Sequence, residues 1–388
     1  MTGDAIEMDG RLRRGGDGLA SAFLPSPAVQ NHAANLALLP DGTLCCVWFG
    51  GTMEGSRDIS ILLSRFDRTA GCWTPAERLS DDPDRSEQNP LLFTAPDGAV
   101  WLLHTAQRAG HQNTAFVRRR VSTDGGASFG PAETFLDVPG TFVRQPVATT
   151  AEGTLLLPVF RCRALPGAVW RGDADDSAVL VSRDGGASWG EVAVPGSTGC
   201  VHMNIVDLGG ELLAAFRSRY ADAVHFARSA DGGETWSRPA PGSLPNNNSS
   251  IQMTKLASGR LAMVYNHAAA TAATAVRASL YDEIEDDGGR GTDRAAEAEA
   301  GSGRAAIWGT PRAPLSIALS EDGGRTWPRR RDLATGEGYC LSNNSADGLN
   351  REFSYPSILE DADGVLHVAY THHRRAIRHV MLREEDIG

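Results

Sequence analysis

The sequence predicts an all-β protein, a six-bladed β-propeller with its ring closed by a strand from the N-terminal region. Two interleaved repeats predict this fold. A turn containing Gly, followed by an apolar run, occurs six times. The second motif, S-x-D-G-G-x-[ST]-[WF], occurs intact four times and once in a decayed form. Short strands with Gly-rich turns, recurring at about 50–60 residues, are typical of four-stranded blades. The turn motif lies at 40–48, 96–104, 151–159, 208–216, 257–265 and 362–370, and the second motif at 122–129, 182–189, 229–236, 320–327 and, decayed, 64–73.

The S-x-D-G-G-x-[ST]-[WF] motif has a structural interpretation. Its Asp accepts hydrogen bonds from the backbone of its own turn, and its glycines adopt positive φ without a Cβ clash. The closing aromatic residue docks under the turn. Four intact copies would require four equivalent active sites if the motif were catalytic, so we expect a turn that stabilises each blade.

The last blade needs a strand from elsewhere in the chain. From Phe353 onward there is room for three strands, at 353–361, 365–371 and 377–383. A strand from the first 28 residues must therefore complete it. We expect one domain over 1–388, with a charged, low-complexity and flexible insertion at 283–305.

Composition excludes several classes of function. The net charge is −11 and the sequence has no block of Lys and Arg, which argues against a nucleic-acid partner. The N-terminal stretch lacks the apolar core of a secretory signal, and no apolar run is long enough to span a membrane. We therefore expect a cytoplasmic protein with no membrane partner. The six Cys include no CxxC pair, and we expect no metal and no cofactor.

The repeat also locates a working face. Both kinds of turn lie on one face of the ring, so the start of the first strand and the end of the second strand of each blade meet on the opposite face, near the axis. Six of the ten His fall in these windows, where a shallow site rich in donors and acceptors suits a sugar. The first-strand starts supply Asn31, His32, Gln88, Asn89, Arg144, Gln145, His202, Asn204, Ser249, Ser250, Glu352 and Tyr355, and the second-strand ends supply Gly50, Gly51, Thr52, Glu54, His104, Arg161, Arg217, Arg219, Asn266, His267, His372 and His373.

Several further segments carry a specific resemblance. The S-x-D-G-G turns, which are Asp boxes, stand together with FGGTMEGSRD (49–58), NNNSS (246–250), YNH (265–267), RAPLSIALSEDGGRTW (312–327) and EFSYPS (352–357). This combination resembles the sialidase-like propellers with bacterial neuraminidase repeats, over about 28–384. The resemblance implies a carbohydrate-active enzyme that acts on a terminal acidic glycan residue.

The resemblance also implies roles for particular residues. A sialidase-type site has an arginine cluster for the substrate carboxylate, because guanidinium binds carboxylate bidentately, together with a tyrosine nucleophile activated by Glu and an acidic acid/base. The arginines would be Arg144, Arg217 and Arg312, with Arg57, Arg161, Arg219 and Arg375 in reserve. The nucleophile would be Tyr355 with Glu352, or Tyr370 with Glu54 or Glu352, and the acid/base Asp58. Further substrate contacts would come from Asn89, Gln145, Asn204, Asn247, Asn266, Glu54 and His104.

Two other functions fit the same residues. Some sialidase-like propellers are lyases that remove a terminal rhamnose from glucuronate, and the excess of His and Asn fits that chemistry. An Arg or Asn would neutralise the uronate carboxylate, and a His or Tyr would move the C5 proton. The His candidates are His32, His104, His202 and His267. A carbohydrate-binding propeller without catalysis is the third possibility, and we favour the sialidase-like exo-glycosidase.

Overall fold

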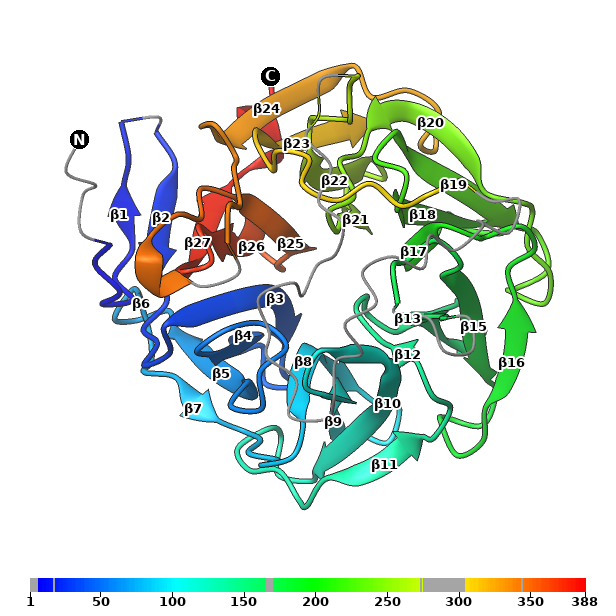
Figure 1. Ribbon diagram of the computed structural model, residues 1–388, viewed down its shortest axis with the longest axis horizontal. Coiled ribbons are helices and arrows are strands. Elements are labelled where there is room, and N and C mark those ends of the chain that lie inside the picture. The colour runs from blue at the N-terminus through cyan, green and yellow to red at the C-terminus, as the bar shows by residue number, and fades with distance from the viewer. Residues whose placement is uncertain (1–5, 17, 165–169, 273, 275–303, 343–344) are drawn as a thin grey trace, which may run out of the picture.

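The computed structural model describes residues 6–16, 18–164, 170–272, 274, 304–342 and 345–388. Six antiparallel sheets stand around a common axis, as Figure 1 shows. We number these sheets blades 1 to 6 along the chain, and the sheet that also contains the two N-terminal strands is blade 6. The predicted all-β, six-bladed propeller is confirmed, and the long interval between the fifth and sixth turns contains no extra blade among these residues.

Blades 1 to 3 follow one another along the chain. Blade 1 contains β3 (Gln30–Leu38), β4 (Leu44–Gly51), β5 (Ser60–Asp67), β6 (Cys72–Trp73) and β7 (Glu77–Arg78). Blade 2 contains β8 (Ser86–Thr94), β9 (Val100–Arg108), β10 (His111–Ser122) and β11 (Glu133–Leu136). Blade 3 contains β12 (Thr141–Phe142), β13 (Ala148–Thr149), β14 (Leu155–Arg161), β15 (Asp176–Ser182) and β16 (Gly190–Ala193).

Blades 4 and 5 continue the ring, and blade 6 takes strands from both ends of the sequence. Blade 4 contains β17 (Cys200–Asp207), β18 (Leu212–Ser218), β19 (Ala223–Ser229) and β20 (Ala240–Pro245). Blade 5 contains β21 (Gln252–Lys255), β22 (Leu261–Asn266), β23 (Leu315–Ser320) and β24 (Arg329–Ala334). Blade 6 contains β25 (Phe353–Glu360), β26 (Leu366–His372), β27 (Ala376–Leu382), β2 (Ala20–Phe23) and β1 (Arg13–Arg14). Two short 3-10 helices are η1 (Ser345–Asp347) and η2 (Glu384–Asp386).

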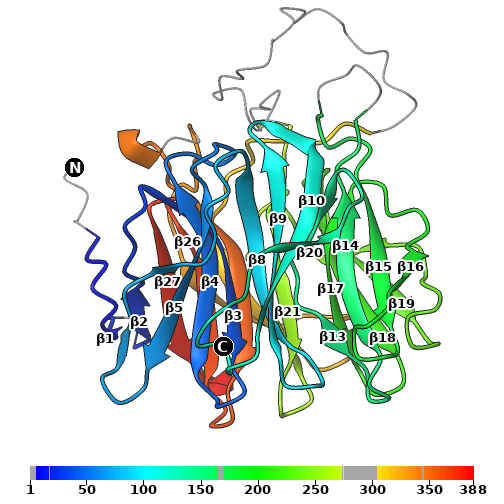
Figure 2. The same cartoon turned by 90° about the horizontal axis from the view of Figure 1, so that it is seen from below.

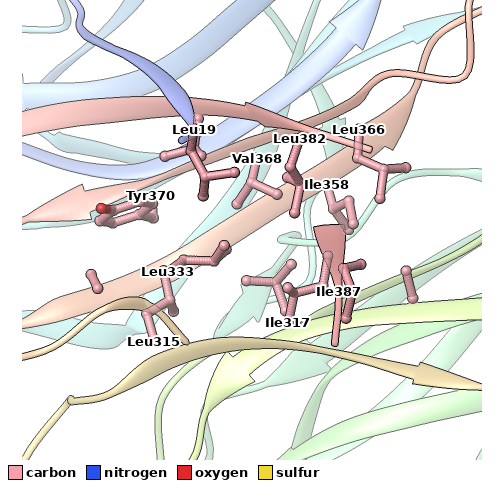
Figure 3. Close-up of a cluster of buried hydrophobic side chains, with 14 of the residues drawn as sticks. Leu19, Leu315, Ile317, Leu333, Ile358, Leu366, Val368, Tyr370, Leu382 and Ile387 are labelled. Atoms are coloured by element: carbon pink, nitrogen blue, oxygen red, sulfur yellow. The ribbon is translucent and has the colours of Figure 1, made fainter. Parts of the chain in front are cut away.

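The predicted ring closure is confirmed. Strand β2 pairs antiparallel with β27, with Ala20 opposite Met381 and Phe23 opposite Arg378. Apolar side chains pack between neighbouring blades, because each inner strand is buried on both faces. Figure 3 shows the cluster between blades 5 and 6, in which Leu315 of β23 lies near Tyr370 of β26.

The Asp boxes are turns between the third and fourth strands, as predicted. Ser122 Oγ donates to Asp124 Oδ1 (2.7 Å) and accepts from Gly126 N (2.8 Å). Asp124 also accepts from Ser128 N (2.9 Å) and Ser128 Oγ (2.5 Å). The corresponding bonds recur at 182–188, 229–235 and 320–326. Each turn therefore satisfies its own polar groups.

Figure 2 shows the strands running between the two faces of the ring. In the predicted insertion, residues 283–303 lie outside the described residues, and only 304 and 305 are described. In the part of the chain that the structure describes, no helix is both long and apolar enough to cross a membrane.

Candidate functional site at the propeller axis

One position recurs in every blade. Ala33, Asn89, Arg144, His202, Ser250 and Tyr355 each lie five residues before the end of their blade's first strand, counting β13 as the end of that strand in blade 3.

In four blades this residue has a positive φ, between 50° and 61°, and sits in a β-bulge where the register with the second strand shifts. A bulge re-aims a side chain that would otherwise follow the regular alternation. This backbone device points His202 and Tyr355 into one cluster.

Tyr355 is the centre of that cluster. Its hydroxyl accepts a hydrogen bond of 2.6 Å from Arg217 Nη1. The guanidinium carbons of Arg144, Arg217 and Arg312 lie 5.4, 5.5 and 5.6 Å from the centroid of its ring. The rings of His32 and His202 lie 4.2 and 5.5 Å away, centroid to centroid. Five residues that the sequence analysis predicted therefore surround Tyr355, which it also predicted.

Glu352 lies in the same cluster but is bound by arginines. Arg312 Nη1 donates to both of its carboxylate oxygens (3.1 and 3.3 Å), and Arg374 Nε donates to Oε1 (2.5 Å). Ser354 Oγ donates to Oε1 at 2.9 Å, and Arg374 also pairs with Glu54. Burial alone would raise the pKa of Glu352, but Arg312 and Arg374 outweigh it and lower the pKa to about 2.

Positive charge exceeds negative charge around Tyr355. Four buried guanidiniums, those of Arg144, Arg217, Arg312 and Arg374, face two buried carboxylates, those of Glu54 and Glu352. Buried charges are normally paired, so this excess indicates a site made for an anion.

Two of those arginines have no carboxylate among their described hydrogen bonds. Arg217 Nε donates to Asn248 Oδ1 (2.8 Å), and burial lowers the pKa of Arg217 to about 9. Arg144 Nη2 donates to three backbone carbonyls at 3.1 Å, and burial lowers the pKa of Arg144 to about 10. An anion would restore the pairing that burial otherwise makes costly.

Both histidines of the cluster are neutral near pH 7. Burial, reinforced by the nearby arginines, lowers the pKa of His32 and the pKa of His202 well below 6.5. His202 Nδ1 lies 3.0 Å from Ser250 Oγ, and His32 Nδ1 lies 2.9 Å from Thr371 Oγ1. His32 Nε2 is buried and has no hydrogen-bond partner among the described residues.

Beneath the cluster, polar residues tie the blades together across the axis. Gln145 Nε2 donates to the carbonyl of Ile251 (2.6 Å), and Gln252 Nε2 donates to Gln145 Oε1 (3.1 Å). Asn204 Oδ1 accepts from Met253 N at 2.5 Å. Gln145 and Asn204 therefore connect blades and support the cluster from below.

The remaining predicted amides and two of the predicted histidines belong to blades 2 and 5 and to the segment that joins blades 4 and 5. Asn247 Nδ2 donates to the carbonyl of Pro311, next to Arg312 in the chain, and Asn266 Nδ2 donates to the carbonyl of Phe353 (both 2.8 Å). In blade 5 the hydroxyl of Tyr265 is 2.7 Å from His267 Nδ1. In blade 2, Asn89 occupies the bulge, and His104 Nδ1 is 3.7 Å from a Glu87 carboxylate oxygen.

Asp58 and Tyr370 lie in other surroundings. Asp58 is exposed and accepts hydrogen bonds from Thr52 N (2.8 Å) and Thr52 Oγ1 (2.9 Å). It lines a groove of about 310 Å³ in blade 1, together with Ser60 and Arg78. Tyr370 is buried in the apolar cluster between blades 5 and 6 (Figure 3).

Sequence reasoning missed three residues of the site. Arg374 follows His372 and His373 directly, so the window at the end of the second strand stopped one residue short. Asn248 is the neighbour of the chosen Asn247 in a run of three asparagines. Asp175, which binds Arg219 at 2.6 Å, lies outside the repeat windows, and no sequence signal points to it.

The ring of six blades with Asp-box turns defines the class of protein, a sialidase-like β-propeller. Residues 42–368 match the family described as BNR repeat-like domain. The chain belongs to this family, which confirms the resemblance noted from the sequence.

Solved structures share the fold at low sequence identity. A Hadza microbial sialidase superposes with a TM-score of 0.67 and 14% identity, covering 93% of this chain and 67% of that chain. A Dyadobacter fermentans protein of unknown function gives 0.66 and 14%, covering 94% and 97%. The leech intramolecular trans-sialidase gives 0.63 and 12%, covering 93% and 69%. A comparison with curated protein sequences found no match.

Proposed function

We propose that this protein is an exo-acting glycoside hydrolase of sialidase-like type that removes a terminal acidic sugar. One observation carries the proposal. Arg217 and Arg144 are buried beside the hydroxyl and ring of Tyr355, and none of their described hydrogen bonds goes to a carboxylate.

The substrate carboxylate would bind Arg217 and Arg312. The two residues are far apart in the sequence, because Arg217 is at the end of β18 and Arg312 comes before β23. Both guanidiniums nevertheless lie beside the Tyr355 ring. A guanidinium pairs with carboxylate through parallel N–H donors and stays charged at any physiological pH. A neutral sugar would leave this excess positive charge unpaired.

Tyr355 is the proposed nucleophile. Arg217 donates to its hydroxyl oxygen, so negative charge that develops on this oxygen is stabilised in place. The negative charge of an attacking Tyr355 phenolate is balanced by the positive charge of the adjacent guanidinium. This balance suits a sugar that already carries a negatively charged carboxylate at or near the anomeric carbon. The hydrogen bond, rather than the fold, is the basis for choosing Tyr355.

The structural neighbours support the substrate class. Several are sialidases, and one of them is the Trypanosoma rangeli sialidase in complex with sialic acid, with a TM-score of 0.58 and 13% identity, covering 98% of this chain and 57% of that chain. A protein with this fold can thus bind an acidic sugar.

A lyase is the second candidate, favoured by one observation. The two rings packed on Tyr355 belong to neutral histidines, His32 and His202, while the carboxylate of Glu352 is engaged by arginines. Elimination from a uronate needs a neutralised carboxylate and a neutral proton acceptor, and this cluster contains both kinds of group.

The product distinguishes the candidates. Purified protein is incubated with aryl sialoside, aryl glucuronide and a rhamnosyl glucuronide. Release of the aryl group from an acidic glycoside, with a saturated sugar as product, supports the hydrolase. A product that absorbs in the near ultraviolet shows an unsaturated uronate and supports the lyase. Binding of acidic sugars by calorimetry with no turnover of any substrate would replace both proposals with a carbohydrate-binding propeller.

A further inference from the structure

The groove of about 310 Å³ in blade 1 lies at the end of the blade where β3 begins and β4 ends. Gly50 and Gly51, the last residues of β4, give it its shape. A Cβ on Gly50 would lie 2.8 Å from the Cβ of Ala28, and a Cβ on Gly51 would lie 2.8 Å from the carbonyl oxygen of Asp58. Side chains do not approach this closely, so glycine is what lets both neighbouring segments pack against the end of β4.

The groove is lined by one carboxylate and one guanidinium that do not pair with each other. Asp58 Oδ2 accepts from Thr52 N (2.8 Å) and Oδ1 accepts from Thr52 Oγ1 (2.9 Å). The carboxylate is therefore held in place, and each oxygen keeps a second lone pair for a ligand. Arg78 is exposed and has no ion pair or side-chain hydrogen bond with the described residues. Acceptors and donors are thus both open to a ligand.

The rest of the lining is mostly aliphatic. Pro27, Ala28 and Val29 come from the segment before β3, and Leu62 and Ala76 come from blade 1. Val29 is 46% exposed, which is unusual for a large apolar side chain beside a groove that water alone would fill. The volume is at the small end of the range for ligand pockets, about 300–1,000 Å³.

The charge of the groove favours a neutral ligand. Asp58 and Arg78 are the charged residues of its lining, and their charges cancel. In the axial cluster, by contrast, four guanidiniums face two carboxylates. A neutral sugar ring suits the groove, because its hydroxyls can donate to the carboxylate and accept from the guanidinium. The C–H groups of the same ring can pack on the aliphatic side chains.

Two chain segments connect the groove with the axial cluster. Glu54, which pairs with Arg374 in the cluster, is four residues from Asp58, and four extended residues span at most about 14 Å. Gln30, the neighbour of Val29, accepts a hydrogen bond from Glu54 N at 3.1 Å. A short oligosaccharide can therefore reach from one site to the other.

We propose that the groove between Asp58 and Arg78 is a second carbohydrate site, which binds a neutral sugar of the glycan whose terminal acidic sugar binds at the axis. The link to an acidic terminal sugar rests on the proposed function. Binding of a neutral sugar in the groove rests on the lining alone.

The first test uses neutral sugars and the full chain. Glucose, galactose, mannose, N-acetylglucosamine and lactose are titrated and followed by saturation-transfer NMR and calorimetry. At least one should bind the wild type, and Arg78→Ala should weaken it by about ten-fold or more, the effect of losing a charge-assisted hydrogen bond. Because Arg78 has no side-chain partner among the described residues, Tm should not change. Asp58→Asn should weaken the same sugar.

Arg14→Ala is the matched control. Arg14 is an exposed arginine in the outer strand β1 of blade 6, and it also has no ion pair with the described residues. It should bind the neutral sugar as the wild type does. No binding of any sugar in the panel, or equal affinities in Arg78→Ala and the wild type, would overturn the inference.

A linked ligand separates this inference from the proposed function. Lactose carrying the acidic sugar that the wild type binds is titrated into Tyr355→Phe, which should not cleave it. It should bind more tightly than the acidic sugar alone, and Arg78→Ala in the same background should remove that gain. Turnover of acidic glycosides without this gain would overturn the groove inference and leave the proposed function standing. Arg78-dependent binding of a neutral sugar, with no binding of any acidic sugar, would overturn the proposed function and leave the groove as a neutral-sugar site.

Discussion

The two faces of the propeller differ in how completely their charged side chains are paired. On the turn face, each Asp box closes its hydrogen bonds within seven consecutive residues, and in blade 3 the bonds from Ser188 and Ser182 lower the pKa of Asp184 to about 2. On the axial face, Arg217 and Arg144 are buried with no carboxylate among their described hydrogen bonds. The Asp-box carboxylates recur from blade to blade and are fully hydrogen-bonded, which indicates a structural role. The axial arginines occur once each and lack a carboxylate partner, which indicates a binding site.

The largest expected effect is at the centre of the axial face. Tyr355→Phe removes the hydroxyl that Arg217 contacts and keeps the ring. It should lower kcat on an acidic aryl glycoside by at least about 10²–10⁴-fold, the range for loss of a positioned catalytic group, with little change in Tm. Steady-state kinetics and calorimetry measure the two quantities. Wild-type turnover in this variant would show that the nucleophile lies elsewhere.

The turn face should respond in stability instead. Trp236 is 5% exposed under its Asp box, so Trp236→Ala should reduce the free energy of unfolding by about 3–5 kcal/mol, as for large core truncations. Trp327→Ala should act similarly, because Trp327 is 9% exposed. Trp189 is half-buried, and Trp189→Ala should cost less.

Denaturant unfolding provides this measurement, with turnover per folded molecule as the control. Lost turnover at an unchanged midpoint would contradict the structural role of the boxes.

The two kinds of axial arginine should differ from each other. Removing one partner of a charge-assisted pair costs about 1.5–3 kcal/mol, so Arg312→Ala should weaken an acidic sugar ten-fold or more and leave neutral sugars unaffected. Arg144 donates to the carbonyls of Ala34, Tyr355 and Pro356, so Arg144→Ala should lower Tm as well as affinity.

Calorimetric titration with acidic and neutral sugars compares the two variants. Equal losses for both ligands in Arg312→Ala would indicate that Arg312 holds the fold and not the carboxylate.

A further comparison concerns pH and a buried histidine chain at the ring closure. Trp73 Nε1 donates to His379 Nδ1 (3.1 Å), His379 Nε2 lies 3.0 Å from His367 Nδ1, and His367 Nε2 lies 3.1 Å from Asp361. Burial lowers the pKa of both histidines below 6.5, so unfolding takes up protons in acid. Stability should be full above about pH 6.5 and fall below it, by up to about 1.4 kcal/mol per pH unit for each histidine.

Urea midpoints between pH 7.5 and 5 test this slope. His379→Gln should flatten it, and the same change at the exposed His111 should not. Midpoints that rise as the pH falls would contradict the assignment of neutral histidines.

The fold was predictable from sequence because its signals are local and repeated. Each Asp box contains its own hydrogen-bond partners within a few residues, and each of the six Gly-containing turns corresponds to one blade. The site was only partly predictable. The bulge position that gathers His202 and Tyr355 follows from strand spacing, but the partner of each charge depends on contacts between distant blades. Arg374 with Glu352, and Arg219 with Asp175, are pairings of this kind.

The strand that completes blade 6 sets the order in which this protein can fold. Ser21 bonds Arg378 across 357 residues of sequence, so β2 can pair only with β1 until the ribosome has released β27. Blades 1 to 5 can pair their own strands during synthesis, whereas ring closure joins β2 to β27, which is synthesised after all five. Such a long-range step is slow relative to local pairing and leaves the edges of β2 and β27 open to other strands in the meantime. A nascent chain of this protein is therefore vulnerable to aggregation at these edges until β27 has been synthesised.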